Sequence, residues 1–504
     1  MIGIFLATGL LLSQGLFART YGWPSEGRAY GILHGSDGTY AVAGFLWVSR
    51  EYEFDFLLLK LSPSGELQWA KTIGGAYCDY AYSIDQTSDG GYVVGGWGQS
   101  YSFPYDDFFL VKVSSGGDFQ WARTFGGQYH DFGWSVIQTS DEGFAFVGET
   151  EISGSGYSDA LILKLSSSGE LQWAKTWGGA KSDRAYSVIQ TPDGGFVVAG
   201  NTLSFGAGGV DALVLKLSSS GELQWAKTFG GSSEETARCI IPTSDGGFAV
   251  AGWTFSAGAG RCDVLVLKLA ADGNLQWART FGGVDDERGF SIVETSDGGY
   301  AVAGHTTSFG VGSYDFLILK LTSDGVLQWA STFGTSGEDH LTSIIQNPDT
   351  TYTMAGTLSS GDNFDPMVLM LNANGQYPGC VQTYPFVQGT PTLNTTSPPA
   401  GVVVCSPNFI SSTPSIAAAE PGVVDQCSPM DVSEFDPDGY GVSCVSIPGG
   451  LLFISQGEAD IRIYLPDGRL ACSEKLRRGR NEIRLDGGVY FWMSGQYRGK
   501  GVIQ

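Results

Sequence analysis

The chain is short of charged residues, and above all of positive charge. Only 16% of its 504 residues are Asp, Glu, Lys or Arg, whereas a soluble domain usually has about 25%. Its 28 Lys and Arg stand against 52 Asp and Glu, which gives a formal net charge of −24 at pH 7. Nucleic acid and anionic membrane surfaces attract proteins through a positive field. We therefore expect no nucleic-acid partner, and neutral or cationic partners stay open.

Residues and motifs of common enzymes are also scarce. The chain has four histidines and lacks the HExxH, Walker A and nucleophile-elbow sequences. It has no CxxC pair of the kind that holds a metal ion. These absences favour a binding protein over an enzyme, with no catalytic residue, no metal site and no cofactor.

Cysteines are few before residue 379, where only Cys78, Cys239 and Cys262 occur. We expect Cys239 and Cys262 to be packed thiols, because a third strand would separate the strands that carry them. The other five are Cys380, Cys405, Cys427, Cys444 and Cys472. In an exported protein this later group predicts one or two disulfides, whose pairing the sequence leaves open.

The apolar run at residues 2–12 is too short to span a bilayer as a helix and has the length of a signal-peptide core. Ser13 and Gly15 supply the small residues expected before a cleavage site. We therefore predict a signal peptide at 1–15, cleavage after Gly15, and a secreted, extracellular or outer-membrane surface protein.

Glycine is abundant, with 74 residues, and it belongs to a long repeat. Six tryptophans lie 52 residues apart, and Phe17 falls in the same register: Phe17, Trp69, Trp121, Trp173, Trp225, Trp277 and Trp329. The aspartate of a glycine-rich turn keeps the same spacing seven times: Asp37, Asp89, Asp141, Asp193, Asp245, Asp297 and Asp349. A fixed period of this size is typical of solenoids and propellers.

Each unit alternates as four short strands separated by glycine-rich turns, at 185–191, 196–200, 211–217 and 223–228 in the fourth unit. Seven such units predict an all-β, seven-bladed β-propeller over 16–378, with a β-solenoid as the alternative. The last unit lacks its fourth strand, and residues 16–22 match that strand. We therefore expect the N-terminal segment, with Phe17, to close the seventh blade.

Periodicity ends after the repeats. Residues 379–430 are rich in Thr, Ser and Pro and predict an extended connector. Residues 431–504 alternate again, with the succession IYLPDGR at 463–469, GRNEI at 479–483 and GVYF at 488–491. This succession resembles the type A C-terminal sorting domain of bacterial type IX secretion substrates, and the repeats resemble those of secreted bacterial β-propeller proteins. The resemblance implies a small C-terminal β-sandwich, recognition by a secretion machinery, and either cleavage or anchoring of this domain.

The candidate binding residues lie at one end of the predicted propeller. An acid occupies one register of the loop before the first strand of each unit: Asp79, Asp131, Asp183, Glu235, Glu287 and Asp339. Just inside it, the first strands begin with Tyr30, Tyr82, Trp134, Tyr186, Arg238, Phe290 and Thr342. We expect an acidic ring beside aromatic rings, which suits sugars or a calcium ion. Trp97, Tyr101 and Trp253, in or next to the variable loops at this end, are further candidate contacts.

A lysine recurs on the third strand of six units: Lys60, Lys112, Lys164, Lys216, Lys268 and Lys320, with Met370 in the seventh. A buried ammonium must be paired, so we expect each lysine to meet an acid or a carbonyl between blades. Taken together, the sequence predicts a monomeric, non-enzymatic scaffold that binds a glycan, peptide or protein. A hydrolase or lyase using the acidic ring and a purely structural surface module are the alternatives.

Overall fold

The computed structural model describes residues 15–22, 26–48, 53–102, 105–127, 129–151, 158–360 and 363–377, together with the backbone of further strands between 387 and 503. Among these residues it contains strands and no helix, so none has the length and hydropathy of a membrane-spanning helix. The chain divides into two compact units, Met1–Gln426 and Cys427–Gln504.

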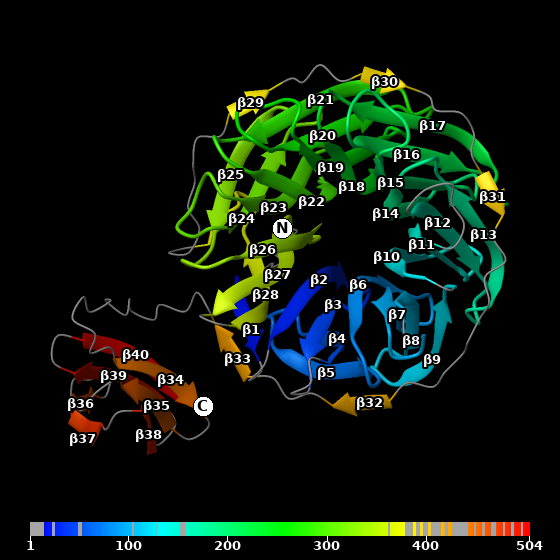
Figure 1. Cartoon of the computed structure of the whole chain (residues 1–504). Helices are drawn as coiled ribbons and strands as arrows, with labels where there is room; N and C mark the ends of the chain where they lie inside the picture. The colour runs from blue at the N-terminus through cyan, green and yellow to red at the C-terminus, as the bar shows by residue number, and fades with distance from the viewer. Residues whose placement is uncertain are drawn as a thin grey trace, which may run out of the picture. The chain divides into compact units, whose positions relative to one another are not determined.

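The first unit is the predicted seven-bladed propeller, and Figure 1 shows its antiparallel sheets following one another around a ring. From the axis outward, the blades are β2 (Gly27–His34), β3 (Tyr40–Trp47), β4 (Phe54–Leu61) and β5 (Leu67–Gly74); β6 (Asp79–Gln86), β7 (Tyr92–Gly98), β8 (Asp107–Val113) and β9 (Phe119–Phe125); β10 (Asp131–Gln138), β11 (Phe144–Thr150), β12 (Asp159–Leu165) and β13 (Leu171–Trp177); β14 (Asp183–Gln190), β15 (Phe196–Thr202), β16 (Asp211–Leu217) and β17 (Leu223–Gly230); β18 (Glu235–Pro242), β19 (Phe248–Thr254), β20 (Asp263–Leu269) and β21 (Leu275–Gly282); β22 (Glu287–Glu294), β23 (Tyr300–Thr306), β24 (Asp315–Leu321) and β25 (Leu327–Phe333); and β26 (His340–Gln346), β27 (Tyr352–Ser360), β28 (Asn363–Leu371) and β1 (Ala18–Gly22).

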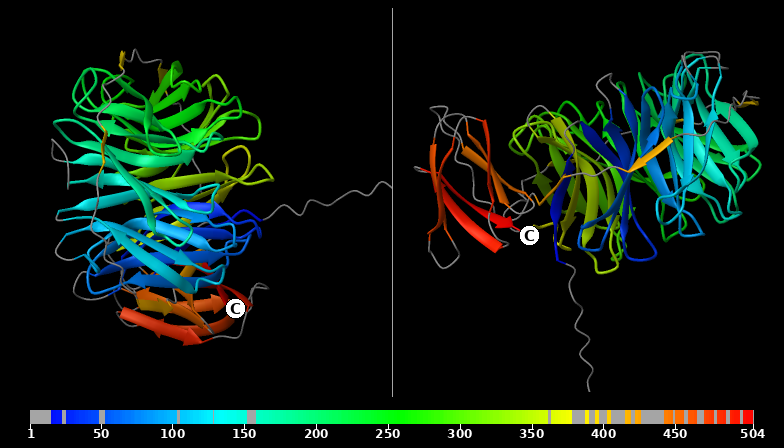
Figure 2. Two further views of the ribbon diagram at one scale, coloured as in Figure 1. Left: turned by 90° about the vertical axis from the view of Figure 1, so that its right-hand side faces the viewer. Right: turned by 90° about the horizontal axis from the view of Figure 1, so that it is seen from below.

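The hydrophobic core lies between neighbouring blades. Strand β16 is buried at every residue, since a blade covers each of its faces. One cluster, for example, joins Val214 and Phe229 of the fourth blade to Val250 and Leu267 of the fifth. The side views in Figure 2 show the twisted blades packed face to face in this way. Cys239 and Cys262 are both free thiols; Cys262 is buried, as expected, whereas Cys239 is partly exposed.

The N-terminal strand closes the ring, as the repeat register predicts. Strand β1 pairs antiparallel with β28, with Ala18 opposite Leu369 and Thr20 opposite Met367. Phe17, directly before β1, is only 2% exposed, and its carbonyl accepts a hydrogen bond from the Met370 amide at 2.7 Å. Residues 1–14, which hold most of the predicted signal peptide, lie outside the described residues.

The aromatic residue that recurs every 52 residues has a structural role at every blade boundary. Each aromatic ring lies against a glycine in the next blade whose φ is between 69° and 79°, a conformation that favours glycine. A Cβ on any of these glycines would lie within 3.1 Å of the ring. The seven contacts are Phe17 on Gly65, Trp69 on Gly117, Trp121 on Gly169, Trp173 on Gly221, Trp225 on Gly273, Trp277 on Gly325 and Trp329 on Gly375.

The recurring lysines are buried, and each pairs with a carboxylate of its own blade and not of a neighbouring blade. The predicted contact between blades occurs at Lys60, which also donates to the Ser115 carbonyl of the next blade at 3.4 Å. The Lys216 ammonium lies 3.0 Å from the Asp193 carboxylate, and Asp193 belongs to the turn between β14 and β15 of the same blade. The reason is geometric, because this turn lies at the same end of the blade as the lysine-bearing end of β16. Hydrogen bonds from Thr191 and Lys216 lower the pKa of Asp193 to about 2. The other five pairs are Lys60–Asp37, Lys112–Asp89, Lys164–Asp141, Lys268–Asp245 and Lys320–Asp297.

The connector adds short strands that its composition did not predict. Five of them pair antiparallel with the outermost strand of a blade, and Figure 1 shows them on the rim of the ring. In chain order they are β29 (Val387–Gly389) on β21, β30 (Asn394–Thr396) on β17, β31 (Val402–Val404) on β13, β32 (Ser415–Ala418) on β5 and β33 (Gly422–Asp425) on β1. The connector therefore passes around the propeller in the direction opposite to the blades.

The second unit consists of two antiparallel sheets. One contains β34 (Val442–Ile447), β35 (Gly450–Ser455) and β38 (Gly479–Arg484). The other contains β36 (Ala459–Tyr464), β37 (Leu470–Leu476), β39 (Gly488–Ser494) and β40 (Tyr497–Ile503). Strands β36, β38 and β39 overlap the motif segments 463–469, 479–483 and 488–491, whereas β34 and β35 were not predicted individually from the sequence.

Candidate functional site at the propeller axis

The innermost strand of every blade carries a β-bulge at one and the same repeat position. In β14, for example, Ala185 pairs with Gly200 and Ser187 pairs with Ala199, so that Tyr186 is the extra residue. A bulge bends the strand and re-aims the side chain of its extra residue. The seven bulged residues are Tyr30, Tyr82, Trp134, Tyr186, Arg238, Phe290 and Thr342, the set that the sequence places at the start of the first strands.

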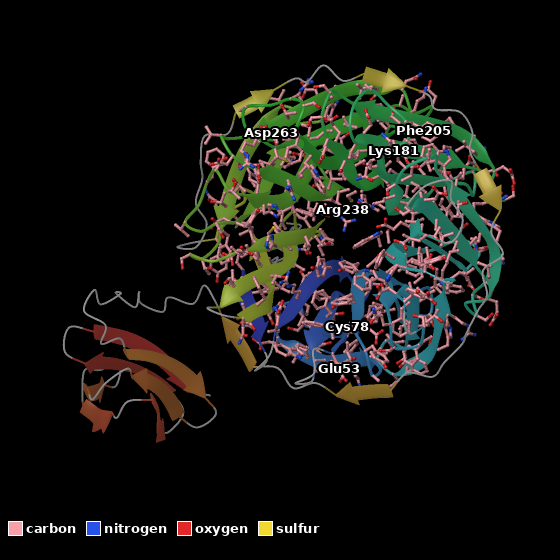
Figure 3. All side chains as sticks on the ribbon, in the orientation of Figure 1. Glu53, Cys78, Lys181, Phe205, Arg238 and Asp263 are labelled. Carbon is pink, nitrogen blue, oxygen red and sulfur yellow. The ribbon has the colours of Figure 1, made fainter. Side chains whose placement is uncertain are left out.

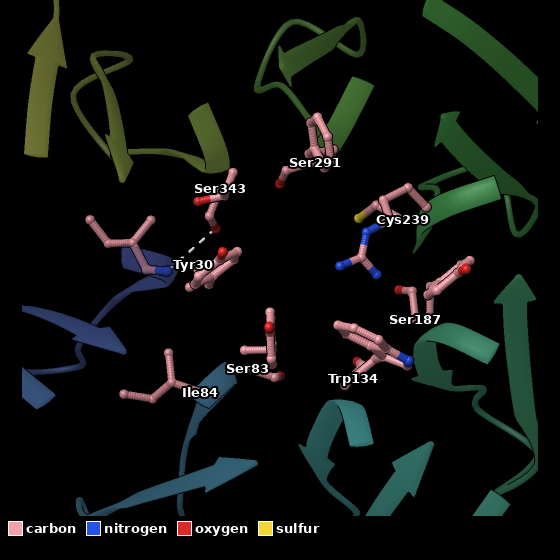
Figure 4. Close-up of a pocket in the computed structure, with 16 residues that line it drawn as sticks. Tyr30, Ser83, Ile84, Trp134, Ser187, Cys239, Ser291 and Ser343 are labelled. Carbon is pink, nitrogen blue, oxygen red and sulfur yellow. Dashed lines mark hydrogen bonds between the residues drawn. The ribbon is translucent and has the colours of Figure 1, made fainter. Parts of the chain in front are cut away.

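These bulged residues surround a cavity of about 210 Å³ on the axis of the ring. Figure 4 shows Tyr30 and Trp134 at this cavity, and Figure 3 shows Arg238 near the axis. Four predicted contacts, Tyr82, Trp134, Tyr186 and Arg238, therefore do meet at one place.

Five of the bulged side chains form a continuous arc. Ring centroids are 4.6 Å apart between Tyr30 and Tyr82, 4.7 Å between Tyr82 and Trp134, and 5.9 Å between Trp134 and Tyr186. The Arg238 guanidinium ends the arc, 4.7 Å from the centroid of Tyr186. The remaining two blades break the pattern, because Phe290 packs against Trp253 and His305 and Thr342 is small. The cavity is therefore asymmetric.

A ring of hydroxyls lies directly after the bulge in the sequence. Ser187 accepts a hydrogen bond from the Ile240 amide of the next blade at 3.2 Å, and Ser291 does so from the Ile344 amide at 3.3 Å. Cys239 takes this place in the fifth blade and Gly31 in the first. The full set of hydroxyls is Ser83, Ser135, Ser187, Ser291 and Ser343. Our sequence interpretation missed them, although their 52-residue spacing could have revealed them.

Arg238 is the one charged residue among those that line the cavity. Its guanidinium lies over two rings, 5.3 Å from the centroid of Trp134 and 4.7 Å from that of Tyr186. Burial lowers the pKa of Arg238, while Tyr186 and Tyr82 act to raise it. Arginine nevertheless stays protonated in proteins, so the cavity wall carries a positive charge.

The six predicted acids do not form an exposed ring. Each is 0% exposed, and each lies where the loop before the first strand meets the loop after the second. Asp79, for example, accepts hydrogen bonds from the Gly75 amide at 3.1 Å and the Ser100 hydroxyl at 2.6 Å. The same holds for Glu235, which accepts bonds from the Gly231 amide and the Thr254 hydroxyl at 2.6 Å each. The structure therefore corrects the expected placement: Asp79, Asp131, Asp183, Glu235, Glu287 and Asp339 hold loops together inside the propeller.

Burial of carboxylates beside one another also shifts their protonation. Burial raises the pKa of Asp79 to about 7, and burial together with the neighbouring Asp131 raises that of Asp107 to about 8. Burial likewise raises the pKa of Asp131 to about 7. Among the described residues no group of three or more His, Cys, Asp or Glu side chains is placed to hold a metal ion. Calcium binding stays a prediction.

The other predicted contacts take part in packing. Trp97 lies on β7 with its ring 5.0 Å from that of Phe132 in the next blade, and Trp253 lies on β19 against Phe290. The Tyr101 hydroxyl donates a 2.7 Å hydrogen bond to the Gly74 carbonyl. None of these three lines the cavity.

Next to the bulged residues, the four boundaries between the third and the seventh blade carry four different side-chain pairs. Glu149 and Arg184 form an ion pair at 2.7 Å, and the Asn201 amide donates to the Thr236 hydroxyl at 3.2 Å. The boundaries after these use Arg288 over the Trp253 ring and a hydrogen bond between the imidazoles of His305 and His340. Variation around the axis thus extends beyond the cavity wall.

Comparison with known proteins adds little to this geometry. No family model matches the chain. A curated protein described as regulatory protein FlaEY, from Caulobacter vibrioides, is 27% identical over 187 residues, which are 32% of this chain and only 20% of that protein.

Two solved structures are also only distantly similar to this chain. Sqt1 from Chaetomium thermophilum matches 72% of this chain and 99% of its own, with 11% identity and a TM-score of 0.41. PorZ, described as a bacterial surface component of the type IX secretion system of Porphyromonas gingivalis, matches 92% of this chain and 64% of its own, with 11% identity and a TM-score of 0.35. The assignment of a propeller therefore depends on the sheets of this chain, and the site on its own residues.

Proposed function

We propose that this chain is a secreted or surface-displayed binding scaffold that holds a ligand in the cavity on the propeller axis. One observation carries the proposal: the bulge occurs in all seven inner strands, but the residue that it presents is Tyr in three blades and Trp, Arg, Phe or Thr in the other four. A ligand without sevenfold symmetry requires such variation, whereas blade packing does not. Cavities lined by aromatic side chains and a few polar groups are typical binding sites.

The cavity wall suits part of a glycan or of a peptide or protein. The rings of Tyr82, Trp134 and Tyr186 offer faces for C–H groups or apolar side chains, and the serine ring offers hydroxyls. A hydrolase or lyase using the acidic ring finds less support, because those carboxylates are buried and hydrogen-bonded to loops. We propose no catalytic residue.

The experiment is a binding screen of the full chain against glycan and peptide arrays, repeated with Thr342→Phe. Thr342 is the smallest of the seven bulged residues that line the cavity, so a phenyl ring there fills part of the space. Val284→Phe adds the same ring at a residue that is 74% exposed and serves as the control. We expect ligands that bind the wild type and Val284→Phe but not Thr342→Phe. Binding that is insensitive to Thr342→Phe refutes the cavity as the site, and no binding at all favours the structural module.

Calcium is tested in the same screen by adding Ca²⁺ or a chelator. We expect no change in ligand binding, because the described acids pair with loop amides and hydroxyls. Loss of binding on chelation would assign a calcium role to the carboxylates.

We further propose that Cys427–Gln504 is a β-sandwich that directs export and takes no part in ligand binding. The motif succession between 463 and 491 and the two antiparallel sheets of this unit support the proposal. Deleting residues 431–504 should leave a folded propeller that stays inside the cell. Normal surface display of the truncated chain, measured by protease accessibility on intact cells, would contradict it.

A further inference from the structure

Arg238 differs from most other arginines of the chain in its partners. Five described arginines lie within 4.0 Å of a carboxylate: Arg19, Arg28, Arg123, Arg184 and Arg261. Arg238 instead contacts the faces of Trp134 and Tyr186, and among the described residues no carboxylate or hydrogen-bond acceptor meets it. In a chain with nearly two acids for each base, an unpaired arginine at a cavity is unexpected.

The surroundings of Arg238 keep its hydrogen-bonding edge available. A guanidinium that stacks on aromatic rings uses its flat faces, and its five N–H donors lie in the plane between them. No Asp or Glu is among the sixteen residues that line the cavity. The tyrosines of the wall are neutral at ordinary pH, since burial raises the pKa of Tyr30, Tyr82 and Tyr186.

We propose that the cavity binds a carboxylate-bearing group of the ligand, with Arg238 donating to the carboxylate and the rings of Trp134 and Tyr186 holding the guanidinium in place. This inference depends on the proposed binding function and specifies its ligand class. A carboxylate matches the planar fork of a guanidinium in a two-bond arrangement. Cation–π contacts with the two rings fix the fork before the ligand arrives.

The cavity also has room for the body that carries the carboxylate. Its volume of about 210 Å³ exceeds the roughly 150 Å³ of an engineered cavity that binds benzene in another protein. A small ring or an apolar side chain bearing a carboxylate therefore fits beside Tyr82 and Trp134. The chain as a whole has a formal charge of −24, but the one charged side chain that lines the cavity is positive. The charge of the ligand is therefore predicted from the cavity and not from the net charge.

The test is a calorimetric titration of the full chain with benzoate, with its neutral analogue benzamide and with phenyl phosphate. It is repeated with Arg238→Met, which removes the charge and keeps an apolar stem, and with Arg238→Lys, which keeps the charge without the fork. Arg279→Met is the matched control, because Arg279 also stacks on a tryptophan, 5.5 Å from the Trp277 centroid, but on the outer strand β21.

We expect benzoate to bind at least tenfold more tightly than benzamide, and Arg238→Met to lose at least tenfold in benzoate affinity. The benzoate affinity of Arg238→Lys should lie between those of the wild type and Arg238→Met. Arg279→Met should bind benzoate as tightly as the wild type does. Equal affinities for benzoate and benzamide, an unchanged Arg238→Met, or no benzoate binding would each overturn the proposal. Tighter binding of phenyl phosphate would also overturn it and assign a phosphate.

The result is distinguishable from failure of the proposed function. Array ligands that bind the wild type, fail with Thr342→Phe and ignore Arg238→Met would leave the scaffold standing and refute the carboxylate. If Arg238→Met does not fold, as judged by circular dichroism, the comparison of benzoate with benzamide and the Arg238→Lys variant still decide the matter.

Discussion

Contacts in the outer part of the blades repeat from blade to blade, whereas contacts in the inner part vary. Toward the rim, the aromatic-on-glycine contact occurs at all seven boundaries and the lysine–aspartate pair in six blades. At the axis, the bulge repeats but its residue does not, and neighbouring blades meet through an ion pair, an amide, a cation–π contact or two imidazoles. The repeated contacts build the ring, whereas the varied ones distinguish one blade from the next and shape the cavity.

Breaking a rim contact at the closure should have the largest effect. Phe17 is 2% exposed and lies on Gly65 of the first blade, so Phe17→Ala leaves a cavity where the ring shuts. Truncation of a buried Phe costs about 3–5 kcal/mol, and we expect a loss of this size in urea unfolding. Deleting residues 16–22 should cost more, because β28 then loses its partner strand.

Phe17→Trp is the matched control, since the other six boundaries use Trp at this position. It should unfold close to the wild type. A mature N-terminus at Arg19 or later, together with an unchanged Phe17→Ala, would show that the blade closes without this contact.

The lysine pair should show a smaller and asymmetric effect. Asp193→Asn keeps the hydrogen bonds of the turn but leaves the Lys216 ammonium without its carboxylate, while Lys216 is only 6% exposed. We expect a loss of about 2 kcal/mol, below the value for a fully buried pair because the Asp193 side chain is 57% exposed. Lys216→Met should cost less than about 1 kcal/mol, as Met370 occupies this position in the seventh blade. Equal losses of stability in the two variants would show that an unpaired buried ammonium is not what destabilises Asp193→Asn.

The buried carboxylates should make stability fall as pH rises from about 4, near the pKa of an aspartate in the unfolded chain, to about 8, the highest of their folded pKa values. The part of this decrease between about pH 7 and pH 8.5 is the one to measure. Burial raises the pKa of Asp79 and Asp131 to about 7, and burial with a neighbouring carboxylate raises that of Asp107 to about 8, so the folded chain holds protons that the unfolded chain has lost. Such a group stabilises the fold at low pH, and its contribution is lost as pH rises through the folded pKa.

The measurement is the melting temperature across this range, with a decrease of a few degrees expected. Asp107→Asn is neutral at every pH and should flatten the slope. His305 and His340 oppose this trend only weakly above about pH 7, because burial lowers their pKa in the folded chain and an unfolded histidine, with a pKa of about 6.5, has by then lost most of its proton. A melting temperature that rises with pH over this range would contradict the burial of protonated carboxyls.

Changes in the varied inner pairs should have the smallest effect. In a double-mutant cycle, Asn201→Ala and Thr236→Val remove the two partners of a 3.2 Å hydrogen bond. We expect a coupling energy of about 1 kcal/mol or less, typical of one neutral hydrogen bond. A coupling larger than that between Asp193 and Lys216 would reverse the comparison between rim and axis.

The sequence predicts the architecture well because the period of 52 residues registers every blade. Strand positions, the closing segment and the role of Phe17 follow from that register and from alternation, and the structure confirms them. The aspartates at the start of the third strands are less uniform than their spacing: Asp211 accepts the amides of Ala207 and Gly208, whereas Asp55, Asp107 and Asp159 each keep one buried carboxylate oxygen without a hydrogen bond.

The site was only partly predictable. Periodicity shows that Tyr186 and Arg238 share a register, but only the bulge in the inner strand shows that both face the axis. The acid at 79 and its equivalents looked like loop-tip residues. No sequence pattern shows that the loop before the first strand and the loop after the second, both at one end of the blade, fold over them. The strands of the connector depend on the free outer edges of the blades, which exist only once the ring has formed.

The position of β1 also bears on the order of events during folding. This strand lies between β28 and β33, both of which come from the far end of the same unit. Contacts between residues so distant in the chain form slowly, because loop closure must precede them. We therefore expect the ring to close last, with the first strand to be synthesised waiting for partners that are made some hundreds of residues later. Until then the incomplete sheets keep open edges, at which strands of other chains can add, so a holding chaperone or prompt export would favour the correct product.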